Sequence, residues 1–591
     1  MRRAGAHIWR GAALRGSLYG SCFQCRPQGQ QLSRSAYSTR GLSPEPTIYA
    51  LSTAPGRAAI AIIRLSGPAC LDIYRRLCPG KDDPQARYAT LRTIYDPSGE
   101  AREVLDSNAL VLYFPSPRTV TGEDVLELHV HGGPAVVKAV LAAISRCSTS
   151  SSARQPSIRY AEPGEFTRRA FLNDRLDLTK VEALGDTLSA TTEQQRRLSV
   201  RGTTGTLAKQ YEAWRKQLLY ARGELEALID FSEDQHFDES PGELCSSVAK
   251  QVRVLKRMLL AHSQNAVRGE LLKNGIRISL LGAPNAGKSS LLNRIVGREA
   301  AIVSQEAGTT RDVVEIGLDI GGYLCRLGDT AGLRKALESA GAKDSSNEVK
   351  LAQQALENTI GEVEKEGMRR AKARAAESDV VIVVLSFEST PQGVKLHLDP
   401  EVIATASHLH STKSNTLIVL NKADLATPTQ QNAAIAETLA AIPTLTPDRI
   451  HRISCKSDAT TSHTPPSTTH VAATNTSQDT GNIPAFLSAL LSHFGTLTAA
   501  LTPGGADDPS LWQESLGASE RHRVLLERCV EALDAFLAEV EVEEDGEADI
   551  VVAAEHLRAA GECLARITGK GEAGDVEEVL GVVFEKFCVG K

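Results

Sequence analysis

The sequence predicts a multidomain protein of mixed α+β and α/β architecture, in which an α/β domain is inserted between two α-helical segments. Three observations support this fold class. The chain has 591 residues, which is too long for one hydrophobic core. The run Ile276–Leu281 predicts a buried strand, and a glycine-rich loop and a helical stretch follow it. On both sides of this α/β segment, Leu, Ala and Glu recur at helical spacing.

Composition narrows the class of protein. The 66 Lys and Arg against 72 Asp and Glu give a net charge of -6, whereas a protein that binds nucleic acid mainly through phosphates is normally basic. Any nucleic-acid contact is therefore expected to be local or shared with a partner. The 11 Cys show no paired metal-ligand spacing, which favours a reducing compartment. The longest apolar runs are too short to predict a transmembrane helix.

Residues 1–44 contain no Asp, Glu or Lys but are rich in Arg and Ser. This composition is typical of an organelle transit peptide. We expect residues 1–40 to direct the chain to the mitochondrial matrix, with cleavage between Arg34 and Gly41. The alternative is a basic tail without a targeting role.

An N-terminal α+β domain is predicted over residues 47–163. Its expected strands and helix lie at Thr47–Leu51, 59–65, 109–114, 125–130 and 136–145. Helical segments are expected at 164–272 and 500–591, packed on one another around the α/β domain at 274–495. Two polar tracts, 335–360 and 457–482, are expected to be surface insertions, and no function is assigned to them.

The glycine-rich loop at 282–289 reads G-A-P-N-A-G-K-S and matches the phosphate-binding P-loop pattern between a strand and a helix. Backbone N–H groups of such a loop surround nucleotide phosphates at the start of the helix. Lys288 is expected to contact the β- and γ-phosphates, and the Ser289 hydroxyl to bind Mg²⁺. The remaining nucleotide contacts predicted in this loop are Asn285, Ala286, Gly287 and Ser290.

Three further motifs identify guanine as the base. Asp329 and Gly332, in D-T-A-G, are placed to act near Mg²⁺ and the γ-phosphate. In N-K-A-D at 421–424, the Asp424 carboxylate can accept from both donors of guanine, and adenine offers neither donor there. The residues predicted to contact the base are Asn421, Lys422 and Asp424, with Ser454 and Cys455 supplying backbone N–H groups to guanine O6. The sequence therefore predicts a Ras-like P-loop G domain that binds GTP.

Hydrolysis must differ from that of Ras-like switches. Leu333 stands where those proteins place a water-orienting Gln, and no arginine finger is identifiable. Another residue and another cation are expected to serve. The Asn285 amide oxygen could hold a monovalent cation between the β- and γ-phosphates, or it could simply stabilise the loop.

Further motifs carry a family resemblance. They are T-G-E-D-V-L-E at 121–127, P-G-E-F-T at 163–167, R-A-F-L-N-D-R-L-D-L at 169–178 and the terminal F-C-V-G-K at 587–591. With the G-domain motifs, they make the chain resemble the tRNA-modifying GTPases of the MnmE/TrmE type from about residue 48 to 591.

The resemblance implies roles for residues around the nucleotide. Asn285 would bind K⁺ together with Ser304, Glu306 and Thr309, and Thr310 would bind Mg²⁺. Glu364 would be the catalytic acid that orients the attacking water. Its neighbours Glu362 and Glu366 are alternatives, because the polar tract at 335–360 can shift the register. Taken without the family, Glu364 is one acid on a charged helix.

In the N-terminal domain, the resemblance implies a tetrahydrofolate-binding fold that also forms a homodimer. Folate contacts would come from Arg64, Glu127, Arg175 and Lys591. An arginine can pair with the folate's glutamate carboxylates, and Glu127 can accept from the pterin N–H edge. Cys588 would be a catalytic thiol in one-carbon chemistry, or else a buried thiol at the end of a helix.

The function implied by the resemblance is K⁺-activated GTP hydrolysis that supports tRNA modification. With a MnmG/GidA-like partner that carries FAD, the protein would add a carboxymethylaminomethyl-type group to C5 of the wobble uridine of mitochondrial tRNA. The carbon would come from a tetrahydrofolate derivative. The chain lacks a dinucleotide-binding fingerprint of its own. Alternatives are a regulatory GTPase in mitochondrial ribosome assembly and a scaffold with a vestigial GTPase.

Overall fold

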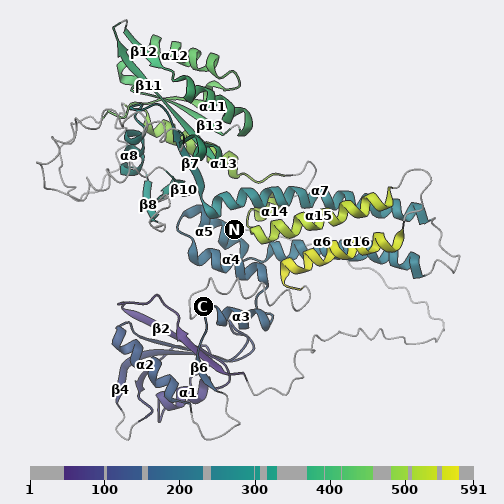
Figure 1. The fold of residues 1–591 in the computed structure, drawn as a ribbon. Helices are drawn as coiled ribbons and strands as arrows, with labels where there is room; N and C mark the ends of the chain where they lie inside the picture. The colour runs from purple at the N-terminus through teal and green to yellow at the C-terminus, as the bar shows by residue number, and fades with distance from the viewer. Residues whose placement is uncertain are drawn as a thin grey trace, which may run out of the picture.

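A computed structural model describes most of the chain (Figure 1). The described residues are 45–98, 103–148, 157–230, 241–298, 300–305, 316–328, 369, 371–391, 393–413, 415–456, 481–502, 509–541 and 549–570. Among them, no helix is long and apolar enough to span a membrane. An N-terminal α+β domain, a bundle of long helices and an α/β domain follow one another in Figure 1.

The N-terminal domain is built on a six-stranded sheet in the order β3-β4-β5-β2-β1-β6. Its elements are β1 (Thr47–Leu51), β2 (Ile60–Ser66), α1 (Cys70–Leu77), β3 (Thr90–Tyr95), β4 (Val104–Phe114), β5 (Val125–His131), α2 (Pro134–Arg146) and β6 (Ile158–Tyr160). Alternate residues of the strands, such as Ile63 and Leu128, pack with Ile73 of α1 and Val140 of α2 into one core. The opposite face therefore presents the intervening residues.

A short helix, α3 (Glu165–Leu172), follows β6 and leads into the helical bundle. The bundle contains α4 (Leu178–Ser189), α5 (Glu193–Gly202), α6 (Thr206–Asp230), α7 (Pro241–Asn274), α14 (Pro509–Ser515), α15 (Glu520–Val540) and α16 (Ile550–Thr568). Residues of α6 and α7 share one core with residues of α15 and α16, including Trp214, Leu259, Phe536 and Leu564. The two helical segments thus pack together, as their sequence pattern predicted.

The α/β domain has a central sheet in the order β14-β13-β11-β7-β10-β9-β8, with β12 paired to β11. Its elements are β7 (Ile276–Leu281), α8 (Lys288–Arg298), β8 (Ala300–Gln305), β9 (Ile316–Ile320), β10 (Tyr323–Leu327), β11 (Val380–Thr390), β12 (Gly393–His397), α11 (Pro400–Lys413), β13 (Thr416–Asn421), η2 (Ala423–Leu425), α12 (Pro428–Ala441), η3 (Pro447–Arg449), β14 (Ile450–Arg452) and α13 (Ile483–Thr498). The strands β10, β7, β11, β13 and β14 run parallel.

Helices cover both faces of this sheet. Leu291 of α8 and Phe486 of α13 belong to the core on one face, and Val402 of α11 and Ala434 of α12 to the core on the other. The carboxyl ends of β7 and β13 consequently open at the same edge, which is where open α/β sheets bind ligands. The P-loop and the N-K-A-D motif both begin at this edge.

Candidate functional site

The phosphate loop connects β7 to α8 and is shaped by two glycines. A Cβ at Gly287, whose φ is +97°, would lie 2.0 Å from Nδ2 of Asn421. A Cβ at Gly282 would lie 2.4 Å from the carbonyl oxygen of Val384. Because real Cβ atoms do not approach other atoms so closely, only glycine fits at these two positions. The loop therefore has the close-packed backbone that a phosphate cradle needs.

Lys288 begins α8, and its ammonium Nζ donates to the carbonyl oxygens of Gly282 and Ala283, both at 2.9 Å. The cation is thus held at the loop. Ser289 and Ser290 follow on the exposed first turn of α8, and Ala286 is buried. Asn285 is exposed and has a φ of +62°, a left-handed conformation that Asn tolerates better than most residues. This is the loop in which the sequence predicts a phosphate group, with Mg²⁺ at the Ser289 hydroxyl and K⁺ at the Asn285 amide.

Asn421 joins the base motif to the phosphate loop. It ends β13, is 2% exposed, and donates from Nδ2 to the carbonyl oxygen of Ala286 at 2.9 Å. Its Oδ1 is buried and has no hydrogen-bond partner among the described residues. An unpaired buried oxygen beside a phosphate loop is a candidate contact for a bound nucleotide. Lys422 follows in the left-handed region, with φ of +58°.

Asp424 lies on η2 and is fixed by the S-C-K motif. The Ser454 hydroxyl donates to Oδ1 of Asp424 at 2.6 Å, and Lys456 Nζ lies 4.0 Å from Oδ2. Ala423 N–H donates to the carbonyl of Ile453 at 3.0 Å, which ties the two motifs through their backbones. These contacts fix the orientation of the carboxylate that the sequence predicts to contact guanine.

The S-C-K motif, predicted to contact guanine O6, has two of its backbone N–H groups engaged within the protein. Ser454 N–H donates to the carbonyl of Gly481 at 3.0 Å, so this group is already engaged. Lys456 N–H donates to the Ser454 hydroxyl at 3.3 Å. Cys455 N–H forms no hydrogen bond within the described part of the chain, so it is the candidate donor to the base. Burial raises the pKa of the Cys455 thiol to about 11, which keeps this side chain neutral.

Several predicted residues lie outside the described residues: Asp329, Gly332, Glu306, Thr309, Thr310, Glu364, Cys588 and Lys591. The transit peptide, the tract 335–360 and residues 457–480 of the second tract lie outside them as well. Ser304 is on β8. Within the described ranges, no group of three or more His, Cys, Asp or Glu could hold a metal ion.

A second candidate site lies on the N-terminal sheet, on the face away from α1 and α2. Arg64 of β2 and Glu127 of β5 are direct cross-strand partners. Arg64 Nε donates to Oε1 of Glu127 at 2.9 Å, and the two side chains are 23% and 14% exposed. Two of the predicted folate contacts are thus brought together as a charged pair that is reachable from solvent. A guanidinium and a carboxylate side by side fit a ligand with both a carboxylate and an N–H edge.

His129 was not predicted and belongs to the same cluster. Its Nε2 lies 3.3 Å from Oε2 of Glu127. The signal was available in the sequence, because residues 127 and 129 of a strand point to the same face. Arg175 approaches from elsewhere: its Nε donates to the carbonyl of Thr119 at 3.0 Å, in the loop that joins β4 to β5. Arg175 is exposed.

Comparison with known proteins gives consistent matches along the chain. The family described as GTP-binding protein TrmE N-terminus matches residues 47–175, and the MnmE helical domain matches residues 178–588. The tRNA modification GTPase MnmE of Parvibaculum lavamentivorans is 38% identical over 92% of this chain and 100% of its own length. The mitochondrial 5-taurinomethyluridine tRNA synthase subunit of Rattus norvegicus is 36% identical over 99% of this chain and 100% of its own. The mitochondrial tRNA modification GTPase mss1 of Schizosaccharomyces pombe is 36% identical over 92% and 95%.

Proposed function

Because the chain belongs to the MnmE/TrmE family of tRNA modification GTPases, we propose that it acts with a flavin-dependent partner on the wobble uridine of mitochondrial tRNAs. The chain is a GTP hydrolase of tRNA modification. The product is a uridine with an aminomethyl-type group on C5. A taurinomethyl group is supported by the rat relative, which is a subunit of a 5-taurinomethyluridine synthase.

The observation that carries the proposal is the coexistence of two sites in one chain. The hydrogen bond from Asn421 to Ala286 marks the nucleotide site, and the Arg64–Glu127 pair marks the N-terminal site. A regulatory GTPase in ribosome assembly needs the first but has no use for a charged pair suited to a folate. The pair therefore favours the modification enzyme over the regulatory switch.

In the nucleotide site, Lys288 neutralises charge on the β- and γ-phosphates, and Asp424 selects guanine over adenine. Ser289 and Thr310, with Asp329 nearby, would hold Mg²⁺, which would screen the phosphate charge. Asn285, Thr309 and main-chain groups of Ser304 and Glu306 would hold K⁺, which would supply the positive charge that other GTPases take from an arginine finger. Glu364 orients the water that attacks the γ-phosphate, because Leu333 has no polar group for this task.

In the N-terminal domain, Arg64, Glu127, Arg175 and Lys591 hold a tetrahydrofolate derivative, which donates the one-carbon unit when bound. Two copies of this domain form the homodimer, whose interface is supported by the apolar side chains exposed on the sheet. Ile60 and Leu91 are 60% and 63% exposed. Cys588 would act as a thiol nucleophile in the carbon transfer.

Mitochondrial placement rests on the acid-free, Arg-rich residues 1–44. The rat and fission yeast relatives are mitochondrial, whereas the Parvibaculum relative, with similar identity, is bacterial. We place the protein in the matrix, where its tRNA substrates and its FAD-carrying, MnmG/GidA-like partner are expected.

Reconstitution tests the proposed function. The purified chain is mixed with its flavin-dependent partner, unmodified tRNA, methylenetetrahydrofolate, GTP and either glycine or taurine, and the tRNA nucleosides are analysed by mass. We expect a C5-modified wobble uridine that disappears without GTP and with the Lys288→Ala variant. Equal modification with and without this chain would contradict the proposal. The amine that is incorporated identifies the product.

A further inference from the structure

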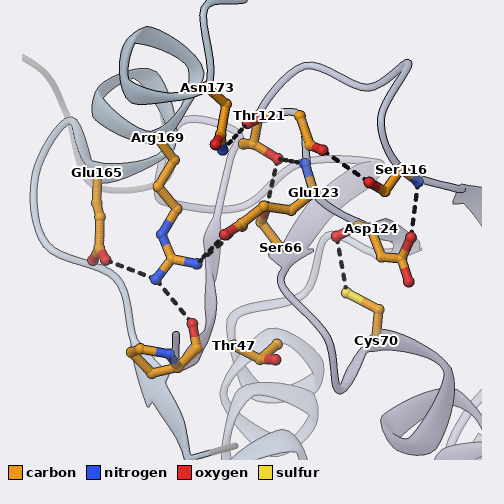
Figure 2. A network of polar contacts seen from close by, with 12 residues as sticks. Thr47, Ser66, Cys70, Ser116, Thr121, Glu123, Asp124, Glu165, Arg169 and Asn173 are labelled. Atoms are coloured by element: carbon orange, nitrogen blue, oxygen red, sulfur yellow. Dashed lines mark hydrogen bonds and ion pairs between the residues drawn. The ribbon is translucent and has the colours of Figure 1, made fainter. Parts of the chain in front are cut away.

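We propose that Glu123 and Arg169 are positioning residues of the folate site, which set the place of Arg175 relative to Arg64. Neither residue is expected to touch the folate. They act through an ion pair between α3, the helix leading to Arg175, and the β4–β5 loop. Glu123 of this loop also accepts a hydrogen bond from Ser66 of β2, the strand that carries Arg64, and Figure 2 shows Arg169, Glu123 and Ser66. The inference rests on the proposed folate-binding function of the N-terminal domain.

The ion pair joins two of the motifs that distinguish this chain from other GTPases. Glu123 belongs to the motif at 121–127, and Arg169 belongs to the motif at 169–178. Arg169 Nη1 donates to both oxygens of Glu123, at 3.1 and 2.9 Å. Arg169 Nη2 donates to the carbonyl of Pro46 at 2.9 Å and to Oε1 of Glu165 at 3.1 Å. Figure 2 shows the guanidinium between the two carboxylates. One arginine thus binds the chain before β1, the β4–β5 loop and its own helix together.

Glu123 extends the connection to the sheet. Its Oε2 also accepts from the Ser66 hydroxyl at 2.6 Å. Ser66 is the last residue of β2 and lies two positions after Arg64, so both side chains point to the same face. The carboxylate of Glu123 therefore links α3 to the strand end next to the Arg64–Glu127 pair.

The connection returns to Arg175 through the same loop. Arg175 N–H donates to the carbonyl of Ala170 at 2.8 Å, and its Nε donates to that of Thr119 at 3.0 Å. The Thr119 hydroxyl donates to the carbonyl of Glu123 at 2.6 Å. The contacts thus form a continuous series. They connect β2 to Glu123, Glu123 to Arg169 of α3, and Arg175 after α3 back to the β4–β5 loop that contains Glu123.

Part of the Arg175 guanidinium remains available to bind a ligand. Its Nη1 and Nη2 form no hydrogen bond or ion pair with the described residues. Two parallel N–H donors on an exposed guanidinium match a carboxylate, such as that of the folate's glutamate. Arg175 Nε is held by the carbonyl of Thr119. The direction in which Nη1 and Nη2 point therefore depends on the positions of the β4–β5 loop and α3.

Burial makes the ion pair a precise connection. The side chains of Arg169 and Glu123 are 5% and 16% exposed. A buried ion pair adds little net stability over a well-packed apolar pair, but it demands a fixed geometry of its partners. We therefore assign the pair a positioning role for Arg175.

A double-mutant cycle tests the proposal. Full-length wild type, Arg169→Lys, Arg175→Ala and the double variant are titrated with 5-formyltetrahydrofolate by calorimetry. We expect Arg169→Lys to weaken binding at least about tenfold in the wild-type background and less than about twofold in the Arg175→Ala background. Equal effects in both backgrounds, or no effect of Arg169→Lys, would overturn the proposal.

Two further variants test whether the effect of Arg169→Lys comes from its ion pair with Glu123. Glu123→Gln keeps an acceptor for Ser66 but removes the charge, and it should behave like Arg169→Lys, including in the cycle. Arg159→Ala is the matched control. Arg159, on β6, forms an ion pair of 2.6 Å with Glu165 of α3, the helix that carries Arg169, but it does not contact Glu123. It should bind folate like the wild type. Failure of the wild-type protein to bind the folate would refute the proposed function itself, independently of the cycle.

Discussion

Asn421 donates a hydrogen bond from its side-chain amide to the backbone carbonyl of Ala286, over 2.9 Å. This single contact couples the loop that reads the base to the loop that holds the phosphates. It also explains why residue 287 is glycine, since a Cβ there would collide with the same amide. The two ends of the nucleotide site therefore share one buried side chain.

This relationship predicts that Asn421→Ala weakens GTP binding. Loss of the hydrogen bond costs about 1–2 kcal/mol, which is roughly 5- to 30-fold in the dissociation constant. Gly287→Ala should be more damaging, because it needs both a positive φ and space that Asn421 occupies. Fluorescent GTP-analogue titration measures both. Asn432→Ala, on α12, is the control, and unchanged binding by Gly287→Ala would disprove the steric argument.

Base selection should depend on Asp424. In Asp424→Asn an amide replaces one acceptor oxygen, so GTP should bind at least about tenfold more weakly and xanthosine triphosphate should bind better. Competition between the two nucleotides measures the change. If the ratio of their affinities stays at the wild-type value, another residue reads the base.

Cation dependence should depend on Asn285. GTP turnover should rise at least about tenfold when K⁺ replaces Na⁺ at constant ionic strength, which corresponds to about 1.4 kcal/mol of transition-state stabilisation. Asn285→Ala should remove the difference between the salts, because the amide that holds the larger cation is gone. Equal wild-type rates in K⁺ and Na⁺ would argue against a cation in the site.

Glu364 should affect hydrolysis and leave binding nearly intact. Ground-state contacts come from the loop, Lys288 and Asp424, so Glu364→Ala should lower kcat by roughly 10²-fold or more at similar GTP affinity. Single-turnover hydrolysis in K⁺ buffer is the measurement. Glu362→Ala and Glu366→Ala are the controls, and a loss of turnover in one of these with an active Glu364→Ala would reassign the residue.

A buried histidine should make the helical bundle sensitive to acid. Burial lowers the pKa of His262 from 6.5 to about 3, and its Nε2 lies 2.8 Å from the Tyr211 hydroxyl. Between pH 6.5 and about 3 the unfolded chain binds a proton here that the folded chain does not, so stability falls as pH falls. Urea unfolding followed by circular dichroism at pH 7 and 5 should show a smaller loss for His262→Gln. The exposed His408→Gln should show the wild-type loss, and identical losses in all three proteins would contradict this assignment.

Local patterns predicted much of the fold. The predicted strand before the P-loop coincides with β7, and the predicted first strand coincides with β1. Both are short apolar runs bounded by turn residues, for which hydrophobic periodicity is a strong signal. By contrast, β6 has only three residues and pairs with β1 across more than one hundred residues of chain. Such a strand exists because of its partner, so its own sequence carries little signal.

Some residues of the candidate sites could likewise be predicted from local sequence, and others depend on contacts between distant segments. The P-loop motif alone predicted Lys288, because strand, loop and helix are contiguous in sequence. The cross-strand pairing of Arg64 with Glu127 needed the register of β2 against β5, which depends on the whole sheet. The engagement of Ser454 N–H by Gly481 depends on two segments that a long polar tract separates. Long-range pairings of this kind are set by packing, and the sequence pattern does not encode them locally.

The central claim is that GTP hydrolysis by this chain supports modification of the wobble uridine of mitochondrial tRNA. The most direct measurement is mass analysis of nucleosides in mitochondrial tRNA from cells that lack the protein. We predict loss of the C5 aminomethyl-type uridine, restored by the wild-type chain but not by Lys288→Ala. An unchanged amount of the modified uridine in the deficient cells would contradict the account.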